Sequence, residues 1–276
     1  MPDTTLVLGA NGKTGRRVAD RLEARGVPVR RGARGGTPPF DWENPATWPA
    51  AVEGMAAMYV SYFPDLAVPG AVDAVRELST IAERAGVRRL VLLSGRGEEE
   101  AQAAEAVVTA GSIEWTVVRC AWFNQNFSEG HLFDPVFAGD VVLPAGSVAE
   151  PFIDVDDIAD VAVAALTEPG HGGKLYEMTG PRLLTFADAI GEIAAATGRD
   201  ITYTQTDLAG YVAAMAEHDL PADVVGLIGY LFGEVLDGRN QWVGDGVEQA
   251  LGRPAKDFSE FARDNAAVWT PSPVRS

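Results

Sequence analysis

The stretch TTLVLGANGKTGRRV, residues 4–18, decides the fold. Residues 4–8 are apolar or β-prone, so they predict a strand that runs straight into a turn. Gly9 lets the chain turn sharply, Gly12 removes a side chain where a diphosphate would come close, and Gly15 lets the next helix pack on the sheet. That helix points its free N–H groups at the phosphates. The stretch therefore predicts dinucleotide binding, with an ordinary strand-to-helix turn as the alternative.

Composition limits the classes of partner. The chain has 276 residues and is 47% hydrophobic, which is enough for a large core. Its net charge of −17 would repel the phosphate backbone of a nucleic acid. The single Cys120 excludes an internal disulfide and fits a reducing compartment. No apolar run is long enough to span a bilayer. The sequence runs directly into a strand pattern, so we expect no signal sequence. We expect a cytoplasmic monomer or homodimer with a small-molecule substrate and no nucleic-acid or membrane partner.

The first half alternates short strand patterns with helical patterns. We expect helices at 16–25, 50–54, 69–85 and 98–109, and strands at 4–8, 27–30, 37–41, 56–60, 89–94 and 115–119. Repeated strand–helix units of this length are typical of an α/β fold with a doubly wound parallel sheet.

The second half is less regular. Helical patterns cover 154–167, 208–237 and 257–269, Thr185 is placed to cap another helix, and strands are expected at 174–179 and 202–204. We expect residues 1–150 to form the nucleotide-binding domain, and residues 151–276 to form mainly a smaller C-terminal α+β substrate lobe, with some return to the sheet. His171 in a glycine-rich turn and His218 in a polar stretch are expected at the surface.

The second strand indicates which cofactor is preferred. A cofactor with a free ribose 2′-hydroxyl usually meets an acid about 20 residues past the glycines, but this region carries Arg30, Arg31 and Arg34 instead. Guanidinium groups suit the 2′-phosphate, which they bind through two parallel hydrogen bonds. Lys13 adds a cation inside the glycine turn. The sequence therefore predicts NADP(H) over NAD(H), with a solvated turn as the alternative.

These stretches, in their order, resemble one known family. The chain resembles the NmrA-like branch of the atypical short-chain dehydrogenases/reductases, the NAD(P)H quinone oxidoreductase-like proteins. The motifs span almost the whole chain: GANGKTGRRV (9–18), Arg30 with Arg34, DW (41–42), SG (94–95), Glu105 before AGSIEWTVVR (110–119), FNQNF (123–127), DVDDIADVA (154–162), YEMTGP (176–181) and LGR (251–253).

The resemblance implies a Rossmann-type domain that binds NADP(H), with a small C-terminal substrate lobe. It implies that the diphosphate is held by Gly9, Asn11, Gly12, Lys13, Thr14 and Gly15, and the 2′-phosphate by Arg34 with Arg30 or Arg31. Asp41 and Trp42 are expected near the adenine. The ribose and nicotinamide are expected along Ser61, Tyr62, Phe63 and Ser94.

The usual proton-relay pair of short-chain dehydrogenases is absent from the sequence. That pair is Tyr-x-x-x-Lys, but the lysines Lys13, Lys174 and Lys256 each follow a glycine by four positions. A proton must therefore come from water or from another side chain, and His131 and Tyr62 are the candidates.

The substrate pocket is expected just after the strand at 115–119. Its candidate residues mix aromatic surface with amide donors: Trp122, Phe123, Asn124, Asn126 and Phe127. The aromatic residues have core packing as their alternative, Asn126 has helix capping, and His131 has a structural role.

Other polar residues have simpler explanations. The acids Asp154, Asp156 and Asp157 begin a helix, where capping and dipole compensation are favoured over a metal site. Glu98, Glu99 and Glu100 are expected in the acidic first turn of a helix, and Cys120 in the core.

The sequence thus favours an NADPH-dependent oxidoreductase that reduces a small quinone-like or carbonyl/enone substrate by hydride transfer. Two alternatives remain: a regulator that binds NADP(H) without turnover, and an isomerase or cyclase on the same fold.

Overall fold

The computed structural model describes residues 3–217 and 221–270. Its contacts divide the chain into two compact units, each assembled from three stretches. Unit 1 consists of Met1–Cys120, Val155–Met178 and Asp245–Pro254, and unit 2 of Ala121–Asp154, Thr179–Gly244 and Ala255–Ser276. Neither unit therefore corresponds to one continuous half of the sequence.

Unit 1 contains a six-stranded sheet in the order β2-β1-β3-β4-β5-β8, and every neighbouring pair of its strands is parallel. The strands are β1 (Thr5–Leu8), β2 (Val29–Gly32), β3 (Ala57–Val60), β4 (Arg89–Gly95), β5 (Glu114–Cys120) and β8 (Lys174–Met178). Because β1 pairs with β2 on one side and β3 on the other, the strand order reverses at β1. Open α/β sheets bind ligands beyond the carboxyl ends of the strands at this switch point. The predicted doubly wound sheet is confirmed.

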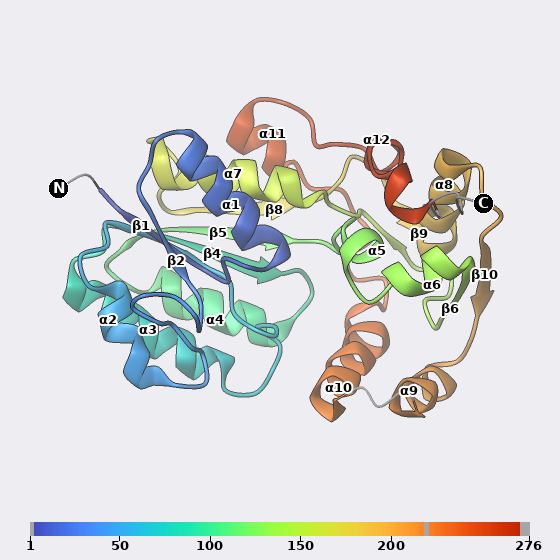
Figure 1. Cartoon of the computed structure of the whole chain (residues 1–276), viewed down its shortest axis with the longest axis horizontal. Helices are drawn as coiled ribbons and strands as arrows, with labels where there is room; N and C mark the ends of the chain where they lie inside the picture. The colour runs from blue at the N-terminus through green and yellow to red at the C-terminus, as the bar shows by residue number, and fades with distance from the viewer. Residues whose placement is uncertain (1–2, 218–220, 271–276) are drawn as a thin grey trace, which may run out of the picture. The chain divides into compact units, whose positions relative to one another are not determined.

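Helices cover both faces of this sheet, with α1 and α7 on one and α3 and α4 on the other (Figure 1). Apolar residues at helical spacing, such as Val75, Leu78 and Ala82 in α3, are buried against the sheet, and this burial holds the layers together. The helices are α1 (Lys13–Ala24), α2 (Trp48–Val52) after the short η1 (Pro45–Thr47), α3 (Ala71–Ala85), α4 (Glu99–Thr109), α7 (Val155–Thr167) and α11 (Gly246–Leu251).

The predicted strand at residues 37–41 is wrong. These residues form bends and irregular backbone, because Pro38 and Pro39 have no N–H to donate to a sheet. The segment instead leads to Phe40 and Trp48, which are buried in the core under the sheet.

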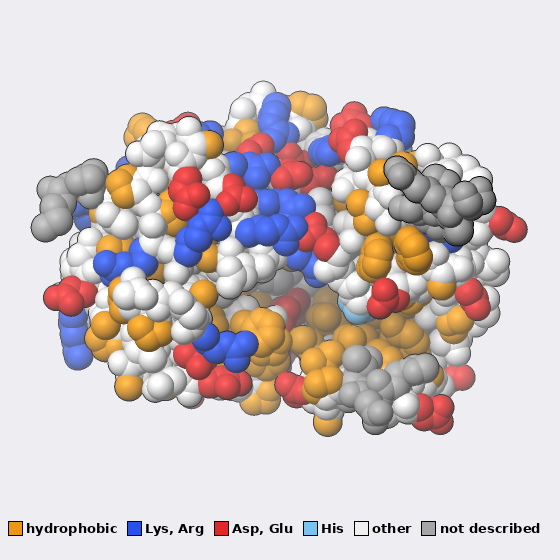
Figure 2. All heavy atoms as spheres, in the orientation of Figure 1, with side chains coloured by type: hydrophobic (Ala, Val, Ile, Leu, Met, Phe, Trp, Pro, Cys, Tyr) orange, Lys and Arg blue, Asp and Glu red, His pale blue; other side chains and the backbone are white. Residues whose placement is uncertain are grey.

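Ion pairs join α1, α7 and α11 within unit 1. Asp156 accepts hydrogen bonds from Arg17 at 3.2 Å and Arg21 at 2.7 Å. Arg253, after α11, binds Asp157 at 2.6 Å and Asp160 at 2.7 Å. Basic and acidic side chains accordingly gather over these helices (Figure 2). Asp156 and Asp157, in the first turn of α7, therefore bind arginines of neighbouring elements.

Unit 2 is built from shorter elements around an aromatic core. Phe127, Phe152, Phe186, Phe258 and Trp269 are all fully buried or nearly so. The helical elements are α5 (Asn126–Glu129), α6 (Phe133–Ala138), α8 (Phe186–Thr197), α9 (Leu208–Glu217), α10 (Ala222–Tyr230), η2 (Leu231–Val235), α12 (Phe258–Asp264) and η3 (Ala266–Trp269). The strands are β6 (Asp140–Leu143), β7 (Ala149–Glu150), β9 (Leu184–Thr185) and β10 (Thr202–Gln205), in the pairs β6–β10 and β7–β9.

Helix α8 begins at the cap that the sequence predicts. The Thr185 side chain accepts a hydrogen bond from the Asp188 N–H at 3.0 Å, and the Asp188 carboxylate accepts one from the Thr185 N–H. This capping box satisfies two backbone donors at once. Within residues 3–217 and 221–270, no helix combines the length and apolar character needed to cross a membrane.

Candidate functional site

The glycine turn after β1 has the backbone that its sequence predicts. Gly9 has a φ of 68°, which lies in the left-handed region that other residues rarely adopt. A Cβ atom on Gly15 would overlap the carbonyl oxygen of Gly9, so glycine is required for α1 to approach β1 this closely. The Gly12 N–H closes the turn by donating to the Gly9 carbonyl oxygen at 2.8 Å.

The N terminus of α1 suits an anion. Gly12 is the N-cap residue, no side chain caps the helix, and its first turn contains no acid. Asn11 is exposed next to it, while Lys13 and Thr14 begin the helix. Uncapped N–H groups and the positive end of the helix dipole attract phosphate oxygens. The turn therefore fits a diphosphate.

Two of the predicted phosphate-binding arginines already have partners. The Arg30 guanidinium donates to the carbonyl oxygens of Ala51 at 2.8 Å and Glu53 at 2.9 Å, at the end of α2. Arg31 binds the carboxylates of Asp20 and Glu23 on α1, at 2.5 Å and 2.9 Å. Hydrogen bonds to these acids raise the pKa of Arg31 further above its usual range.

Arg34 differs from both. Its side chain is exposed in the turn after β2, and among the residues that the structure describes it has no hydrogen bond or ion pair. A guanidinium without partners can bind a phosphate without first breaking other contacts.

Asp41 and Trp42 lie beside an aromatic cluster near the switch point. The Trp42 ring is 4.7 Å from the Tyr62 ring, and its indole N–H donates to the Ser61 carbonyl oxygen at 3.3 Å. Asp41 accepts a hydrogen bond from the Glu43 N–H at 3.1 Å. Burial, and then the charge of Glu43, raise the pKa of Tyr62, so this phenol holds its proton more tightly than a free tyrosine.

The other residues expected along the ribose and nicotinamide differ in exposure. Ser61 lies against the glycine turn, since a Cβ on Gly9 would be 3.2 Å from the Ser61 Cβ. Phe63 is 71% exposed. Ser94 is buried, and its hydroxyl donates to a Glu105 carboxylate oxygen at 2.5 Å. The Ser94 hydroxyl is therefore already used within the fold.

Buried charges join the ends of β4, β5 and β8. Arg119 binds Glu105 on α4 and, at 2.8 Å, Glu177 on β8. Arg96, in the loop after β4, binds Glu177 at 3.0 Å. Because Glu105 and Arg96 are buried, removing one partner would leave an uncompensated charge. The Glu105 and Arg119 positions quoted in the family motif thus form a structural pair.

A carboxyl pair at the same edge of the sheet was not predicted as a site. Glu98 precedes α4, but its side chain does not cap the helix. It is only 7% exposed, and its Oε2 has no hydrogen-bond partner among the described residues. Asp65, in the loop after β3, is hydrogen-bonded to it. Burial, and then the charge of Asp65, raise the pKa of Glu98 to about 9.

The predicted pocket residues belong to unit 2. Trp122 is half-buried and packs against Phe186, with ring centroids 5.3 Å apart. Phe123 is half-buried and forms a parallel bridge with Ile153. Asn124 is fully buried, and neither amide atom has a hydrogen-bond partner in the described part of the chain.

The remaining pocket candidates have different surroundings. Phe127 is fully buried, with its ring 5.6 Å from Phe152 and 5.4 Å from Phe258, so it has the core position that was its alternative. Asn126 is the first residue of α5. His131 is exposed, and its ring lies 6.5 Å from that of Phe232. An exposed imidazole can exchange protons with solvent.

The surface position expected for His171 is wrong. The residue is buried, and its Nδ1 lies 2.8 Å from the Tyr176 hydroxyl. Its carbonyl oxygen accepts a hydrogen bond from the Thr116 hydroxyl at 2.8 Å, which holds the loop against β5. His218 lies outside the described residues. Cys120 is buried as predicted, and burial raises the pKa of its thiol.

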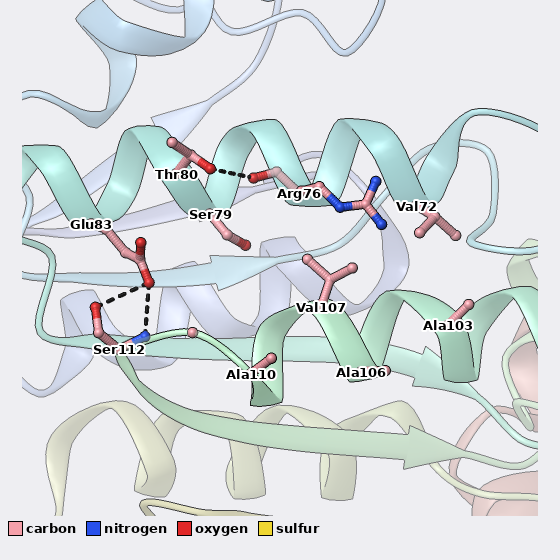
Figure 3. Close-up of a pocket in the computed structure, with 11 residues that line it drawn as sticks. Val72, Arg76, Ser79, Thr80, Glu83, Ala103, Ala106, Val107, Ala110 and Ser112 are labelled. Carbon is pink, nitrogen blue, oxygen red and sulfur yellow. Dashed lines mark hydrogen bonds between the residues drawn. The ribbon is translucent and has the colours of Figure 1, made fainter.

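A groove of about 730 Å³ lies between α3 and α4 (Figure 3). Val72, Arg76 and Val107 line it, and the Glu83 carboxylate at one end accepts a hydrogen bond from the Ser112 N–H at 2.7 Å. Its lining comes from these two helices and the turn after α4. The groove is therefore distinct from the predicted cofactor site.

Comparison with known proteins extends the similarity over nearly the whole chain. No protein-family model matches. The chain is 30% identical over 284 residues to an agroclavine dehydrogenase of Claviceps fusiformis, covering 96% of this chain and 98% of the relative. It is 31% identical over 267 residues to an NAD(P)H azoreductase of Xenophilus azovorans, covering 91% and 87% of the two chains.

A solved structure agrees in fold. The triphenylmethane reductase of Citrobacter sp., complexed with NADP(H), matches with a TM-score of 0.76 and 18% identity. The match covers 96% of this chain and 99% of that one. At this identity the likeness shows a shared fold alone.

Proposed function

The chain belongs to the NmrA-like family of NAD(P)-dependent atypical short-chain dehydrogenases/reductases, and on that premise we propose that it reduces a small quinone-like or carbonyl/enone substrate with NADPH. The cofactor supplies a hydride when bound. The protein supplies binding, orientation and a route for the proton.

The uncapped N terminus of α1 carries this proposal. The glycine turn leaves no room for a Cβ at Gly15, and the first turn of α1 contains no acid. A diphosphate is favoured at a helix N terminus of this kind. We assign the diphosphate to this turn, with Gly9, Asn11, Gly12, Lys13, Thr14 and Gly15 around it.

The 2′-phosphate of the cofactor is assigned to Arg34. Arg30 and Arg31 already bind other groups, whereas Arg34 is exposed without a partner among the described residues. Because the 2′-phosphate is the only difference between NADPH and NADH, this guanidinium gives the preference for NADPH. Asp41 and Trp42 are assigned to the adenine.

The substrate class follows from the chemistry that the residues allow. The Tyr-x-x-x-Lys pair is absent, so the protein lacks the usual proton donor. Quinones suit such a protein, because the oxygens of a reduced quinone are acidic and can take their protons from water. The name of one relative, an NAD(P)H azoreductase, adds azo compounds to this class. We therefore propose a conjugated, electron-poor acceptor.

NADPH consumption with a small panel of acceptors tests the proposal. Purified protein is mixed with NADPH and a para-quinone, a cyclic enone, an azo dye or a cationic triarylmethane dye. We expect oxidation of NADPH that depends on the acceptor and is faster than oxidation of NADH. Binding of NADPH without oxidation by any acceptor would favour a regulator, and product formed without NADPH consumption would favour an isomerase or cyclase.

A further inference from the structure

The acidic residues before α4 contain one that does not behave as a first-turn residue. Glu99 and Glu100 are exposed in the first turn of α4, as predicted. Glu98 instead turns inward, and only 7% of it is exposed. Among the residues that the structure describes, this carboxyl group neither caps a helix nor binds an arginine, so its burial needs another explanation.

The fold makes room for this carboxyl group. A Cβ on Gly95, the last residue of β4, would overlap the Glu98 carboxyl group. Glycine at this position therefore lets the Glu98 side chain fold back over the end of the strand. One carboxyl oxygen, Oε2, is buried without a hydrogen-bond partner among the described residues, so the described part of the fold leaves its hydrogen-bonding capacity unused.

Asp65 connects Glu98 with its surroundings. It lies in the loop after β3, the neighbour of β4, and is hydrogen-bonded to Glu98. It is half-buried, and one of its oxygens accepts a hydrogen bond from the Ala67 N–H at 2.9 Å. Two close carboxyl groups out of water hold one proton between them. Because Asp65 is only half-buried, it can exchange that proton with solvent.

The charges around Glu98 favour its protonated form. Besides Asp65, the carboxylates of Glu100 and Glu105 on α4 raise the pKa of Glu98. The Cys120 thiol, at the end of β5, also faces it and is neutral because burial raises its pKa. Arg96 is the cation in this loop, and it binds Glu177 at 3.0 Å. Burial, the largest cause, and these charges together raise the pKa of Glu98 above neutral pH.

The pair lies at the edge of the sheet where a ligand is expected. The loops after β3 and β4 follow the carboxyl ends of neighbouring strands, and Ser61, also after β3, lies against the glycine turn. Ligands of open α/β sheets occupy this edge.

We propose that Glu98, sharing its proton with Asp65, is the proton donor of the reduction. This inference rests on the proposed function. With NADPH bound, a hydride would add to one atom of a conjugated double bond, and the π bond would break. The electron pair on the other end of the acceptor takes the Glu98 proton, and the carboxyl pair then recovers a proton from water through Asp65. The products are NADP⁺ and the acceptor with one hydride and one proton added.

A pair of acceptors separates proton donation from hydride transfer. A cyclic enone needs a hydride and a proton, whereas a cationic triarylmethane dye needs a hydride alone. Glu98→Gln keeps the shape and can still donate a hydrogen bond to Asp65, but it has no acidic proton. We expect the variant to reduce the enone about 100-fold or more slowly and the dye within about twofold of wild type. Glu99→Gln, on the exposed side of the same turn, is the matched control and should leave both rates unchanged.

A second variant gives a readout in the pH profile. A proton donor acts below its pKa, so the wild-type rate with the enone should fall as pH rises through the Glu98 pKa. Asp65→Asn removes the charge that raises this pKa, and the fall should move to lower pH. In cofactor-free protein, carboxyl ¹³C NMR of labelled glutamate should show a resonance that titrates above neutral pH and is missing in Glu98→Gln.

The outcomes separate this inference from the proposed function. Equal slowing of both acceptors in Glu98→Gln, or an ionised Glu98 at pH 7 in the NMR titration, would overturn the donor role and leave the reductase proposal standing. Failure of the wild-type protein to reduce either acceptor would overturn the proposed function, and the donor role with it.

Discussion

Single arginine residues show how much of a site depends on what each side chain already binds. Arg30, Arg31 and Arg34 stand within five positions and suggest one phosphate-binding cluster. In the structure Arg30 binds carbonyl groups at the end of α2, and Arg31 binds acids of α1. Sequence spacing predicts the charge near β2, but it cannot predict which guanidinium is engaged, because those partners lie on other elements.

The substitution Arg34→Gln tests the assignment of the 2′-phosphate. Loss of charged hydrogen bonds to a phosphate costs about 1.5–3 kcal/mol, which corresponds to about 10- to 100-fold weaker binding. We expect the Kd for NADPH to rise by this factor and the Kd for NADH to stay within about twofold, as measured by calorimetric titration. The exposed Arg84 on α3 offers a control, Arg84→Gln, that should leave both constants unchanged. An equal loss of affinity for the two cofactors would contradict the assignment.

Glu98 marks a limit of prediction at the same scale. In sequence it is one of three consecutive acids before a helix, and dipole compensation explains all three equally well. Only the approach of Asp65 from another loop, and the space left by Gly95, distinguish it from Glu99 and Glu100. The glycine turn after β1 is the opposite case, since every residue of that site is local and its pattern predicts its geometry.

At the scale of elements, α7 shows how the acids of one helix join its neighbours. Its first turn was expected to compensate the dipole, and Asp156, Asp157 and Asp160 also bind arginines from α1 or from the end of α11. Asp157 is 2% exposed, and its ion pair with Arg253 compensates this buried charge. Arg253, the last residue of the family motif LGR, therefore binds two acids of the motif DVDDIADVA within unit 1.

Removing Arg253 should destabilise the protein through Asp157. We expect Arg253→Met to lower the free energy of unfolding by about 2 kcal/mol, since the buried Asp157 carboxylate loses this ion pair. In the double variant with Asp157→Asn, most of that loss should be recovered, because no charge remains to be compensated. Urea unfolding measures both values. Equal destabilisation in the single and double variants would show that packing, not charge, accounts for the effect.

Helix α12 gives a prediction for pH. The Arg182 guanidinium binds Asp257 at 2.6 Å and 2.8 Å, and this contact lowers the pKa of Asp257. A lowered pKa stabilises the fold above the unfolded value, about 3.9, and the effect is lost as pH falls through the folded value. Both side chains are partly exposed, so the screened contribution is about 1 kcal/mol.

Asp257→Asn retains a capping side chain but not the charge. We expect its deficit in unfolding free energy to be constant from pH 8 to 5 and to shrink below about pH 4, as followed by urea unfolding at each pH. The exposed Asp200→Asn should show no such trend. A deficit that persists at low pH would mean that the ion pair contributes little.

Elements with a strong periodic pattern were predictable from the sequence. A segment interrupted by proline, and the division of the later stretches between the two units, were not. The strands β1, β3, β4 and β5 and the helix α3 appear where buried apolar patterns place them. The strand at 37–41 failed because β-prone residues there are interrupted by Pro38 and Pro39. The sequence does not show how the stretches after residue 150 divide between the two units, because that depends on long-range pairing such as β5 with β8.

For the whole molecule, the net charge of −17 means that the few local cations indicate where an anionic cofactor can bind. An anionic cofactor is repelled by the protein as a whole and must be bound through the helix N terminus and nearby guanidinium. Binding should therefore be confined to unit 1, which contains the glycine turn and Arg34.

NADPH should stabilise the folded chain by mass action. At a concentration 100 times its Kd, a ligand adds about 2.7 kcal/mol, which for a chain of this size raises Tm by roughly 5–10 °C. NADH at the same concentration should give a smaller shift in differential scanning calorimetry. Equal shifts, or none, would count against the proposed selectivity.

The pairing of β5 with β8 also has a consequence during synthesis. Strand β5 ends at Cys120 and its partner β8 begins only at Lys174, so the ribosome must add a long intervening segment before the sheet is complete. Until then the nascent chain exposes an apolar strand edge, which can pair with another chain. We expect the newly made protein to depend on chaperones during this interval, and fragments that stop before residue 174 to aggregate.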